Sequence, residues 1–295
     1  MRCGSLAPLF LGYLNFKLHP LPFTPHTRLI SSPKVILVTG GSSGLGWAMC
    51  QRLAAIGHQV VGTGRKPDKS PTGWSLIAMD VTDEASVQRA VDDVIAHHKR
   101  IDVLVNNAGT GIQGAVEDID DALAKQLFEA NVFGLHRVCR AVLPHMRAQK
   151  SGLIINISSI AANFGLPYRA FYSASKAAVD RYGEALSIEV KPFGIQVVTV
   201  QPGEFNTNIP AARLRPANVS EPYRKGYDRA MEILGGSMHY SRDPDELAVV
   251  VAKIIATPRP ASVYRVAQGL QKLSVVLKKF MPGRRFEKMV GKHYE

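Results

Sequence analysis

The fold class of this chain of 295 residues is indicated by the segment Val35-Ile-Leu-Val-Thr39-Gly-Gly-Ser-Ser-Gly44-Leu-Gly46. A strand-like run leads directly into three spaced glycines and then into a helical pattern. Here Gly40 permits a tight turn, Gly44 lets the backbone approach a pyrophosphate, and Gly46 allows close packing of helix on strand. The helix N-terminus adds amide donors, and serines add hydroxyls. We therefore predict a dinucleotide-binding turn rather than a merely flexible loop. Its residues are Gly40, Ser42, Ser43, Gly44, Leu45 and Gly46.

Short β-branched runs alternate with helical segments from residue 34 onward, which predicts a parallel sheet covered by helices on both faces. The predicted strands are 35–39, 59–63, 75–79, 103–106, 152–157, 195–200 and, more weakly, 262–266. The predicted helices are 44–56, 83–98, 119–149 with a break near Phe128, 171–191 and 243–256. Because no linker divides residues 34–266, we expect a single α/β domain of the Rossmann type, with a doubly wound, seven-stranded sheet.

Both ends of the chain depart from this pattern. Residues 1–33 contain five prolines and no acid, and we read them as an irregular extension. A signal peptide fits poorly, whereas an organellar presequence would explain the missing acids. Residues 267–295 form a basic, amphipathic extension. A lid over a cleft, an oligomer contact and a membrane-surface helix remain open for it, with docking onto its own domain as the default.

The net charge of +12 is concentrated at the ends. Residues 1–67 and 259–295 each carry a net +7, whereas the residues between carry −2. A nucleic-acid-binding domain carries its basic stripe on the folded body, so we do not expect a nucleic-acid partner. No apolar run is long enough to cross a bilayer, which indicates a soluble or peripherally bound chain. Three scattered cysteines favour a reducing, cytoplasmic compartment over a disulfide framework or a metal site, and Cys50 and Cys139 read as core residues.

The residues at the end of the second predicted strand indicate which dinucleotide is bound. The segment Gly62-Thr-Gly64-Arg65-Lys66 has no acid before Asp68. An acid at this place accepts a hydrogen bond from the ribose 2′-hydroxyl, whereas a basic residue pairs with a 2′-phosphate. We therefore expect NADP(H) to be held by Arg65 and Lys66, the alternative being two solvated loop cations. Asp80 and Val81, at the end of the third strand, are expected beside the adenine.

The pentapeptide Tyr172-Ser-Ala-Ser-Lys176 sets a phenol and an ammonium one helical turn apart. A lysine held beside a tyrosine stabilises the phenolate, which suits the pair to proton transfer. The same spacing also occurs in helices where the tyrosine merely packs and the lysine reaches solvent. The surrounding motifs have to decide between the two.

Together these segments resemble the short-chain dehydrogenase/reductase family, over residues 34 to 265. The turn TGGSSGLG at Thr39–Gly46 looks like the family's TGxxxGxG, and Asn106-Asn-Ala-Gly109 matches its NNAG. Pro202-Gly203 with Thr207 matches its PGxxxT. The resemblance implies further cofactor-binding residues, namely Asn107, Ala108, Gly109, Tyr172, Lys176, Pro202, Gly203, Phe205 and Thr207.

The resemblance also implies a catalytic tetrad of Asn131, Ser159, Tyr172 and Lys176. In this interpretation Tyr172 exchanges a proton with the substrate oxygen, and Ser159 holds that oxygen. Lys176 stabilises the tyrosinate and binds the nicotinamide ribose, while Asn131 fixes a water in a proton relay. The neighbouring Ser158 is expected to be structural. No metal is needed, because hydride chemistry belongs to the cofactor.

Apolar residues outside the motifs predict a hydrophobic substrate, bound by Phe164 together with Ser159 and Tyr172. The candidates for the cleft, some of them core residues, are Phe164, Leu166, Tyr168, Phe205, Ile209 and Leu214. Within the family, the pattern is nearest to the 17β-hydroxysteroid and retinol dehydrogenases. A general small-carbonyl or acyl reductase and a non-catalytic NADP(H)-binding regulator remain as alternatives. The family habit of pairing long helices implies a homodimer or homotetramer, and the basic ends leave peripheral membrane contact open.

Overall fold

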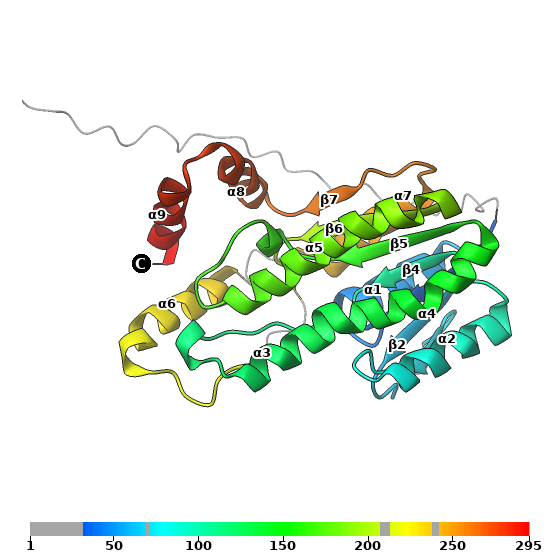
Figure 1. The fold of residues 1–295 in the computed structure, drawn as a ribbon, viewed down its shortest axis with the longest axis horizontal. Coiled ribbons are helices and arrows are strands. Elements are labelled where there is room, and N and C mark those ends of the chain that lie inside the picture. Colours follow the sequence, from blue (N-terminus) through cyan, green and yellow to red (C-terminus); the bar gives the residue numbers. More distant parts are fainter. Residues whose placement is uncertain (1–31, 69–70, 207–212, 238–241, 295) are drawn as a thin grey trace, which may run out of the picture.

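A parallel sheet forms the centre of the computed structural model, which describes residues 32–68, 71–206, 213–237 and 242–294 (Figure 1). The strand order is β3-β2-β1-β4-β5-β6-β7. The strands are β1 (Val35–Val38), β2 (Gln59–Gly64), β3 (Ser75–Ala78), β4 (Val103–Asn106), β5 (Gly152–Ile157), β6 (Ile195–Pro202) and β7 (Val263–Val266). The order reverses between β1 and β4, and ligands of such sheets bind where the carboxyl ends of the strands diverge.

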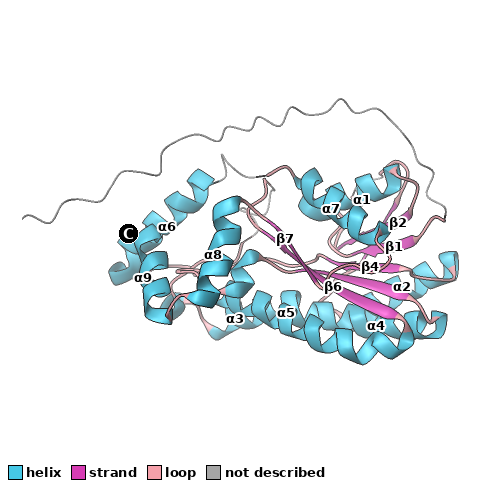
Figure 2. Ribbon diagram, turned by 90° about the horizontal axis from the view of Figure 1, so that it is seen from above, coloured by secondary structure: helices cyan, strands magenta, loops and turns pink. Residues whose placement is uncertain are grey.

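Helices cover both faces of the sheet (Figure 2). They are α1 (Gly44–Ala55), α2 (Glu84–His98), α3 (Asp121–Phe128), α4 (Gly134–Gln149), α5 (Ala170–Val190), α6 (Glu221–Ser237), α7 (Pro244–Ala256), α8 (Gly269–Phe280) and α9 (Gly283–Tyr294). Shorter turns are η1 (Val116–Asp118), the π-helix η2 (Glu129–Phe133), η3 (Ile160–Asn163) and η4 (Lys191–Phe193).

Strand β1 shows how the sequence builds two cores from one sheet. Val35 and Leu37 pack with residues of α2, α4 and α5, whereas Ile36 and Val38 pack with residues of α1 and α7. Side chains alternate across a strand, so a run that is apolar at every position must be buried on both faces. The doubly wound α/β fold with seven parallel strands is thereby confirmed.

Most predicted boundaries agree with the structure to within two residues, and the structure adds detail at three points. The break expected near Phe128 is the π-helix η2, which separates α3 from α4. Helix α6 was not predicted within the insertion from Glu204 to Arg242. The extension 267–295 folds into two helices, α8 and α9. The extension predicted at 1–33 lies outside the described residues, apart from residues 32 and 33.

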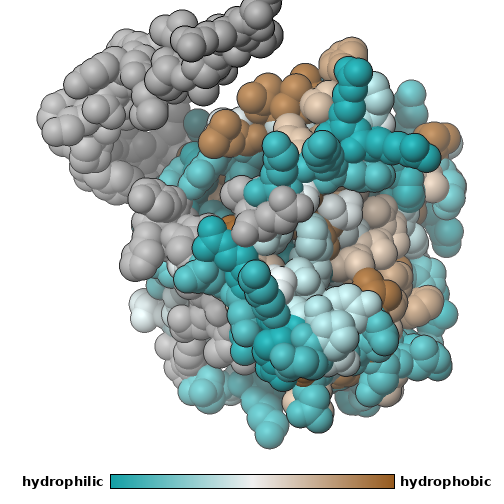
Figure 3. Space-filling model, turned by 90° about the vertical axis from the view of Figure 1, so that its left-hand side faces the viewer, coloured by the Kyte–Doolittle hydropathy of each residue, from teal (hydrophilic) through white to brown (hydrophobic). Residues whose placement is uncertain are grey.

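Helices α8 and α9 pack onto the domain, α8 beside η3 and α9 beside α6. Phe286 of α9 is buried, with its ring 5.1 Å from the ring of Phe164 and 5.0 Å below the ammonium of Lys278. Gly203 allows a close approach at α8, because a β-carbon there would lie 2.1 Å from Gln271 Oε1. In Figure 3, brown and teal surface lie side by side along the upper rim, the level at which Figure 1 shows α8.

Candidate active site

The glycine turn between β1 and α1 has the backbone of a phosphate-binding loop. Gly40 and Gly44 have φ of 66° and 53°, in the left-handed region that favours glycine. A β-carbon on Gly46 would lie 2.1 Å from the Gly40 carbonyl oxygen and 2.6 Å from Asn107 Nδ2. The absence of a side chain at Gly46 therefore lets the start of α1 approach the residues that follow β1 and β4 closely.

The turn is held against the end of β4 by a short network. Thr39 Oγ1 accepts from the backbone N–H groups of Asn107 and Ala108, both at 2.9 Å. Asn107 Nδ2 in turn donates to the carbonyl oxygen of Thr39 at 2.9 Å. At the start of α1 the Ser43 side chain makes no capping bond, and the first turn holds no acid. The first-turn amides are thus left for an anion, and the turn fits a dinucleotide pyrophosphate.

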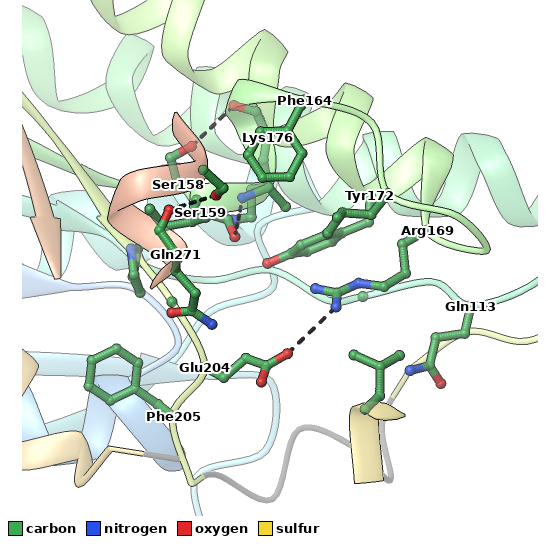
Figure 4. A pocket seen from close by; sticks show the side chains of 18 of the residues that line it. Gln113, Ser158, Ser159, Phe164, Arg169, Tyr172, Lys176, Glu204, Phe205 and Gln271 are labelled. Atoms are coloured by element: carbon green, nitrogen blue, oxygen red, sulfur yellow. Dashed lines mark hydrogen bonds and ion pairs between the residues drawn. The ribbon is translucent and has the colours of Figure 1, made fainter. Parts of the chain in front are cut away.

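Helix α5 carries both members of the predicted proton-transfer pair. Lys176 is buried, and its Nζ donates to the carbonyl oxygen of Ile157 at 3.0 Å. Tyr172 is half-buried, and its ring lies 5.5 Å from the guanidinium carbon of Arg169. Figure 4 shows the Tyr172 hydroxyl pointing into the same cavity that Lys176 and Ser159 face.

Asn131 lies buried in the π-helix η2 and ties two elements together. Its Oδ1 accepts from Thr110 N at 2.8 Å, and its Nδ2 donates to Thr110 O at 3.0 Å and to Ser175 Oγ at 3.1 Å. Ser175 Oγ donates to the Tyr172 carbonyl at 2.8 Å. π-Bulges interrupt helices frequently at functional sites. The hydrogen bonds of Asn131 fix the loop after β4 against α5, which is consistent with a positioning role.

The two neighbouring serines after β5 make different bonds. Ser158 Oγ donates to the Lys176 carbonyl at 3.1 Å and is thereby used structurally. Ser159 Oγ instead accepts from Ala161 N at 3.1 Å, as the N-cap of η3. A hydroxyl has one hydrogen to give. Since Ser159 only accepts in this bond, its hydrogen is available to an oxygen in the cavity.

Ser158, Ser159, Tyr172 and Lys176 line one cavity of about 660 Å³ at the carboxyl ends of β4, β5 and β6, whereas Asn131 lies behind its wall. Its lining joins the tetrad region to apolar side chains from η3, α6, α8 and α9. The apolar lining includes Leu45, Ile112, Ile160, Phe164, Leu166, Phe205, Ile233, Leu234, Leu270, Met289 and Val290. Of the predicted cleft residues, Tyr168 and Leu214 do not line it. The Tyr168 ring packs on Tyr227 at 5.8 Å between centroids, and Leu214 packs beside Ile112. Ile209 lies outside the described residues.

A charged group was not predicted from the sequence. Arg169, Glu204 and Arg213 line the cavity with Lys176. The Arg169 guanidinium extends toward the Glu204 carboxylate at 3.8 Å, longer than a hydrogen bond (Figure 4). Burial and the positive charge of Arg169 lower the pKa of Arg213. Arg169 directly precedes α5 and Glu204 follows Pro202-Gly203, so adjacency to two motifs was the available signal.

Only some of the other predicted cofactor residues line the cavity. Asn107, Gly109, Pro202, Gly203 and Phe205 line it, whereas Ala108 packs against the core. Arg65 and Lys66 are exposed just after β2. Asp80 Oδ1 accepts from Thr82 N and Thr82 Oγ1 at 2.9 and 2.8 Å, and Val81 is nearly buried against Gly134. Thr207 lies outside the described residues.

The part of the chain that the structure describes shows neither a metal-type cluster nor a membrane-spanning helix. No group of three or more His, Cys, Asp or Glu side chains there is arranged to hold a metal ion. No helix in those ranges combines the length and apolarity needed to cross a membrane. Cys50 and Cys139 are free thiols in the two cores, as predicted, and burial raises the pKa of each to about 12.

Comparison with known proteins agrees with this geometry. Residues 34–217 match the model of the short chain dehydrogenase family. The 3-ketodihydrosphingosine reductase of Bacteroides thetaiotaomicron is 41% identical over 256 residues, 85% of this chain and 94% of that protein. Retinol dehydrogenase 8 of Bos taurus is 29% identical, covering 79% and 81% of the two chains. The chain therefore belongs to the short-chain dehydrogenase/reductase family of oxidoreductases.

Solved structures support the same assignment. A short-chain dehydrogenase from Streptomyces avermitilis superimposes with a TM-score of 0.75 at 33% identity, covering 88% of this chain and 98% of that chain. A short-chain dehydrogenase from Burkholderia cenocepacia, solved in complex with NADP, gives a TM-score of 0.66 at 27% identity, with 83% and 92% covered. One of the similar structures thus contains a bound NADP.

Proposed function

We propose that this protein is an NADP(H)-dependent oxidoreductase that interconverts a ketone and a secondary alcohol on a long-chain lipid. The observation that carries the proposal is the shared cavity, in which Ser159, Tyr172 and Lys176 face a mostly apolar space reaching to α8 and α9. A lipid needs such a space for its chain, and polar groups at one end to hold its reacting carbonyl.

In this proposal the cofactor, when bound at the glycine turn, supplies the hydride. Tyr172 supplies the proton that the carbonyl oxygen gains on reduction, and takes it back on oxidation. The free hydrogen of Ser159 bonds that oxygen and stabilises the negative charge that develops on it. Lys176 lies one helical turn from Tyr172 and binds the nicotinamide ribose in this proposal. Asn131 holds Thr110 and α5 in fixed positions relative to each other.

NADP(H) is proposed over NAD(H) because Arg65 and Lys66 are both exposed at the end of β2, before the first acid, Asp68. Charge-assisted hydrogen bonds to a 2′-phosphate contribute about 1.5–3 kcal/mol each. The variant R65Q/K66Q should therefore lower kcat/KM for NADPH by at least roughly 100-fold and leave that for NADH unchanged. R89Q/K125Q removes two exposed cations elsewhere and is the control. An unchanged NADPH preference in R65Q/K66Q would contradict the proposal.

A sphingoid ketone is the proposed substrate class. The support is the similarity to a 3-ketodihydrosphingosine reductase, together with Glu204 in the cavity, because this substrate carries an ammonium beside its ketone. Initial rates of NADPH oxidation with 3-ketodihydrosphingosine, retinal, a steroid ketone, an acyl ketone and cyclopentanone test it. We expect kcat/KM to be highest for 3-ketodihydrosphingosine. A higher value for cyclopentanone would indicate a small-carbonyl reductase instead.

We also propose a homodimer or homotetramer in a reducing, cytoplasmic setting. Exposed Ile188 on α5 and Phe193 on η4 support an oligomer, because large apolar side chains on a helix face favour association. The buried thiols of Cys50 and Cys139 support a reducing compartment. Sedimentation of the wild type and of I188S tests the first point, with a smaller species expected for the variant.

A further inference from the structure

Helix α8 presents an apolar face to solvent. Leu270 is 80% exposed, Leu273 49%, Val276 49% and Phe280 82%. Residues three and four apart lie on the same side of a helix, so these side chains form one outward stripe. Four large apolar side chains in twelve helical residues are far more than the single exposed residues that soluble surfaces carry.

The opposite face of α8 fixes its orientation. Val275 is buried, Gln271 and Ser274 line the cavity, and Lys278 lies over the ring of Phe286. The helix is also capped at its start by reciprocal bonds between Gln268 and Gln271. Because one face is held by these contacts, the outward face is a fixed feature of the surface.

Positive charge borders the apolar stripe. Lys272 and Lys279, seven residues apart on one edge of α8, are exposed, and Arg284 and Arg285 are exposed at the start of α9. Residues 268–286 contain no acidic residue. An apolar stripe flanked by cations is the pattern of a helix that lies in the interface of an anionic bilayer.

We infer that the outward face of α8 docks on the surface of an anionic membrane. A second copy of this face would bring lysines against lysines, which repel. Residues 1–33 carry three cations and no acid, so they do not complement the face either. Anionic headgroups match Lys272 and Lys279, and the acyl boundary matches the leucines and Phe280.

This docking would place the mouth of the cavity at the lipid surface. Leu270 and Met289 both line the cavity and are both exposed, at 80% and 36%. The opening is therefore rimmed by apolar side chains next to the docking stripe. A lipid ketone can then pass from the bilayer into the cavity without crossing water. Only this consequence rests on the proposed function; the docking itself does not.

Co-sedimentation of the full chain with phosphatidylcholine vesicles, with and without phosphatidylserine, tests the inference. Binding should require phosphatidylserine and fall sharply between about 0.1 M and about 1 M salt, as the Debye length shrinks. The variant K272Q/K279Q should bind roughly 30-fold more weakly, since each lysine near an anionic surface contributes about fivefold. R89Q/K125Q should bind like the wild type.

The apolar stripe is tested by L273S and by L273S/V276S/F280S. We expect the triple variant to bind at least roughly tenfold more weakly. The control V116S, which alters a side chain 59% exposed on η1, should keep full binding. The inference is overturned if the wild type does not bind anionic vesicles, or if the triple variant binds as tightly. It is also overturned if R2Q/K17Q/R28Q alone abolishes binding, or if the triple variant dissociates an oligomer without losing vesicle binding.

Activity separates this inference from the proposed function. The triple variant should reduce a ketone soluble in water at the wild-type rate, but show a raised KM for 3-ketodihydrosphingosine in anionic vesicles. Vesicle binding without any ketone reduction would sink the proposed function and leave the docking intact. Ketone reduction without vesicle binding would contradict the docking and leave the proposed function intact.

Discussion

The cofactor side and the substrate side of this molecule are built by different rules. The cofactor side, from β1 to α5, rests on short motifs whose backbone geometry depends on the residues themselves, such as Gly40 with φ of 66°. The substrate side, made by η3, α6, α8 and α9, rests on contacts between distant segments, such as Phe164 against Phe286. A cofactor site can be encoded locally in short motifs, whereas the shape of the substrate cavity depends on how separate elements meet.

Tyr172→Phe should have the largest effect of the changes on the cofactor side. Removing the hydroxyl removes the proton donor, so kcat should fall by roughly 10³-fold. NADPH affinity should stay within a few-fold, because the ring and Lys176 remain. NADPH oxidation measures the first and nucleotide fluorescence titration the second. Tyr182→Phe, on the same helix, is the control and should keep turnover. A Tyr172→Phe enzyme with turnover near the wild type would remove Tyr172 from the chemistry.

Gly46→Ala tests whether the turn depends on the missing side chain. The added carbon would meet the Gly40 carbonyl and the Asn107 amide, and backbone must move to make room. We expect the free energy of unfolding to fall by about 3 kcal/mol, with weaker NADPH binding. Gly235→Ala in α6 meets nothing within 4 Å and should be neutral or stabilising by about 0.5–1 kcal/mol. Urea denaturation compares the two, and equal losses would show that the crowding at Gly46 is unimportant.

Helix α6 shows why the substrate side was harder to predict. Its buried residues Tyr227, Ala230 and Leu234 have helical spacing, but Gly226 and Gly235 weaken the helix signal. In the structure Gly226 has a tertiary role, since a β-carbon there would lie 2.1 Å from the Tyr168 hydroxyl. That contact joins segments almost sixty residues apart, and periodicity within one segment cannot reveal it.

The candidate site divides in the same way. Ser159, Tyr172 and Lys176 follow from motifs with fixed spacing, and the structure brings all three to one cavity. Arg169, Glu204 and Arg213 belong to no motif. Arg169 and Glu204 only adjoin motifs, and it is the fold that brings them together with Arg213 beside Tyr172. The strands were located well because runs such as Val35–Val38 are apolar at every position, a signal that needs no tertiary context.

Glu204→Gln tests the substrate side through its charge. If Glu204 binds the ammonium of a sphingoid ketone, the variant should raise KM for 3-ketodihydrosphingosine by roughly tenfold or more. KM for a ketone without an amine should not change. Glu287→Gln, on the exposed side of α9, is the control. A similar rise of KM for both ketones would assign Glu204 to holding Arg169 instead, and the amine would lose its proposed partner.

The smallest expected effect is a pH dependence on the cofactor side, at His58 between α1 and β2. Burial and the nearby charge of Lys34 lower the pKa of His58 from its ordinary 6.5. Its Nδ1 faces Lys34 N at 3.2 Å, where only the neutral ring can accept the hydrogen bond. The folded state therefore binds fewer protons than the unfolded state once the pH falls below about 6.5.

Stability should consequently be complete above pH 6.5 and decline as the pH falls toward the lowered pKa of His58, by at most about 1.4 kcal/mol per pH unit. Urea denaturation of the wild type and of His58→Gln, from above pH 6.5 down to the lowered pKa of His58, measures the decline. The variant should show a shallower slope, since it has no proton to take up, whereas His97→Gln should retain the wild-type slope because His97 is exposed on α2. Identical slopes for all three proteins would place the acid sensitivity outside His58, and the turn between α1 and β2 would then contribute to stability through packing alone.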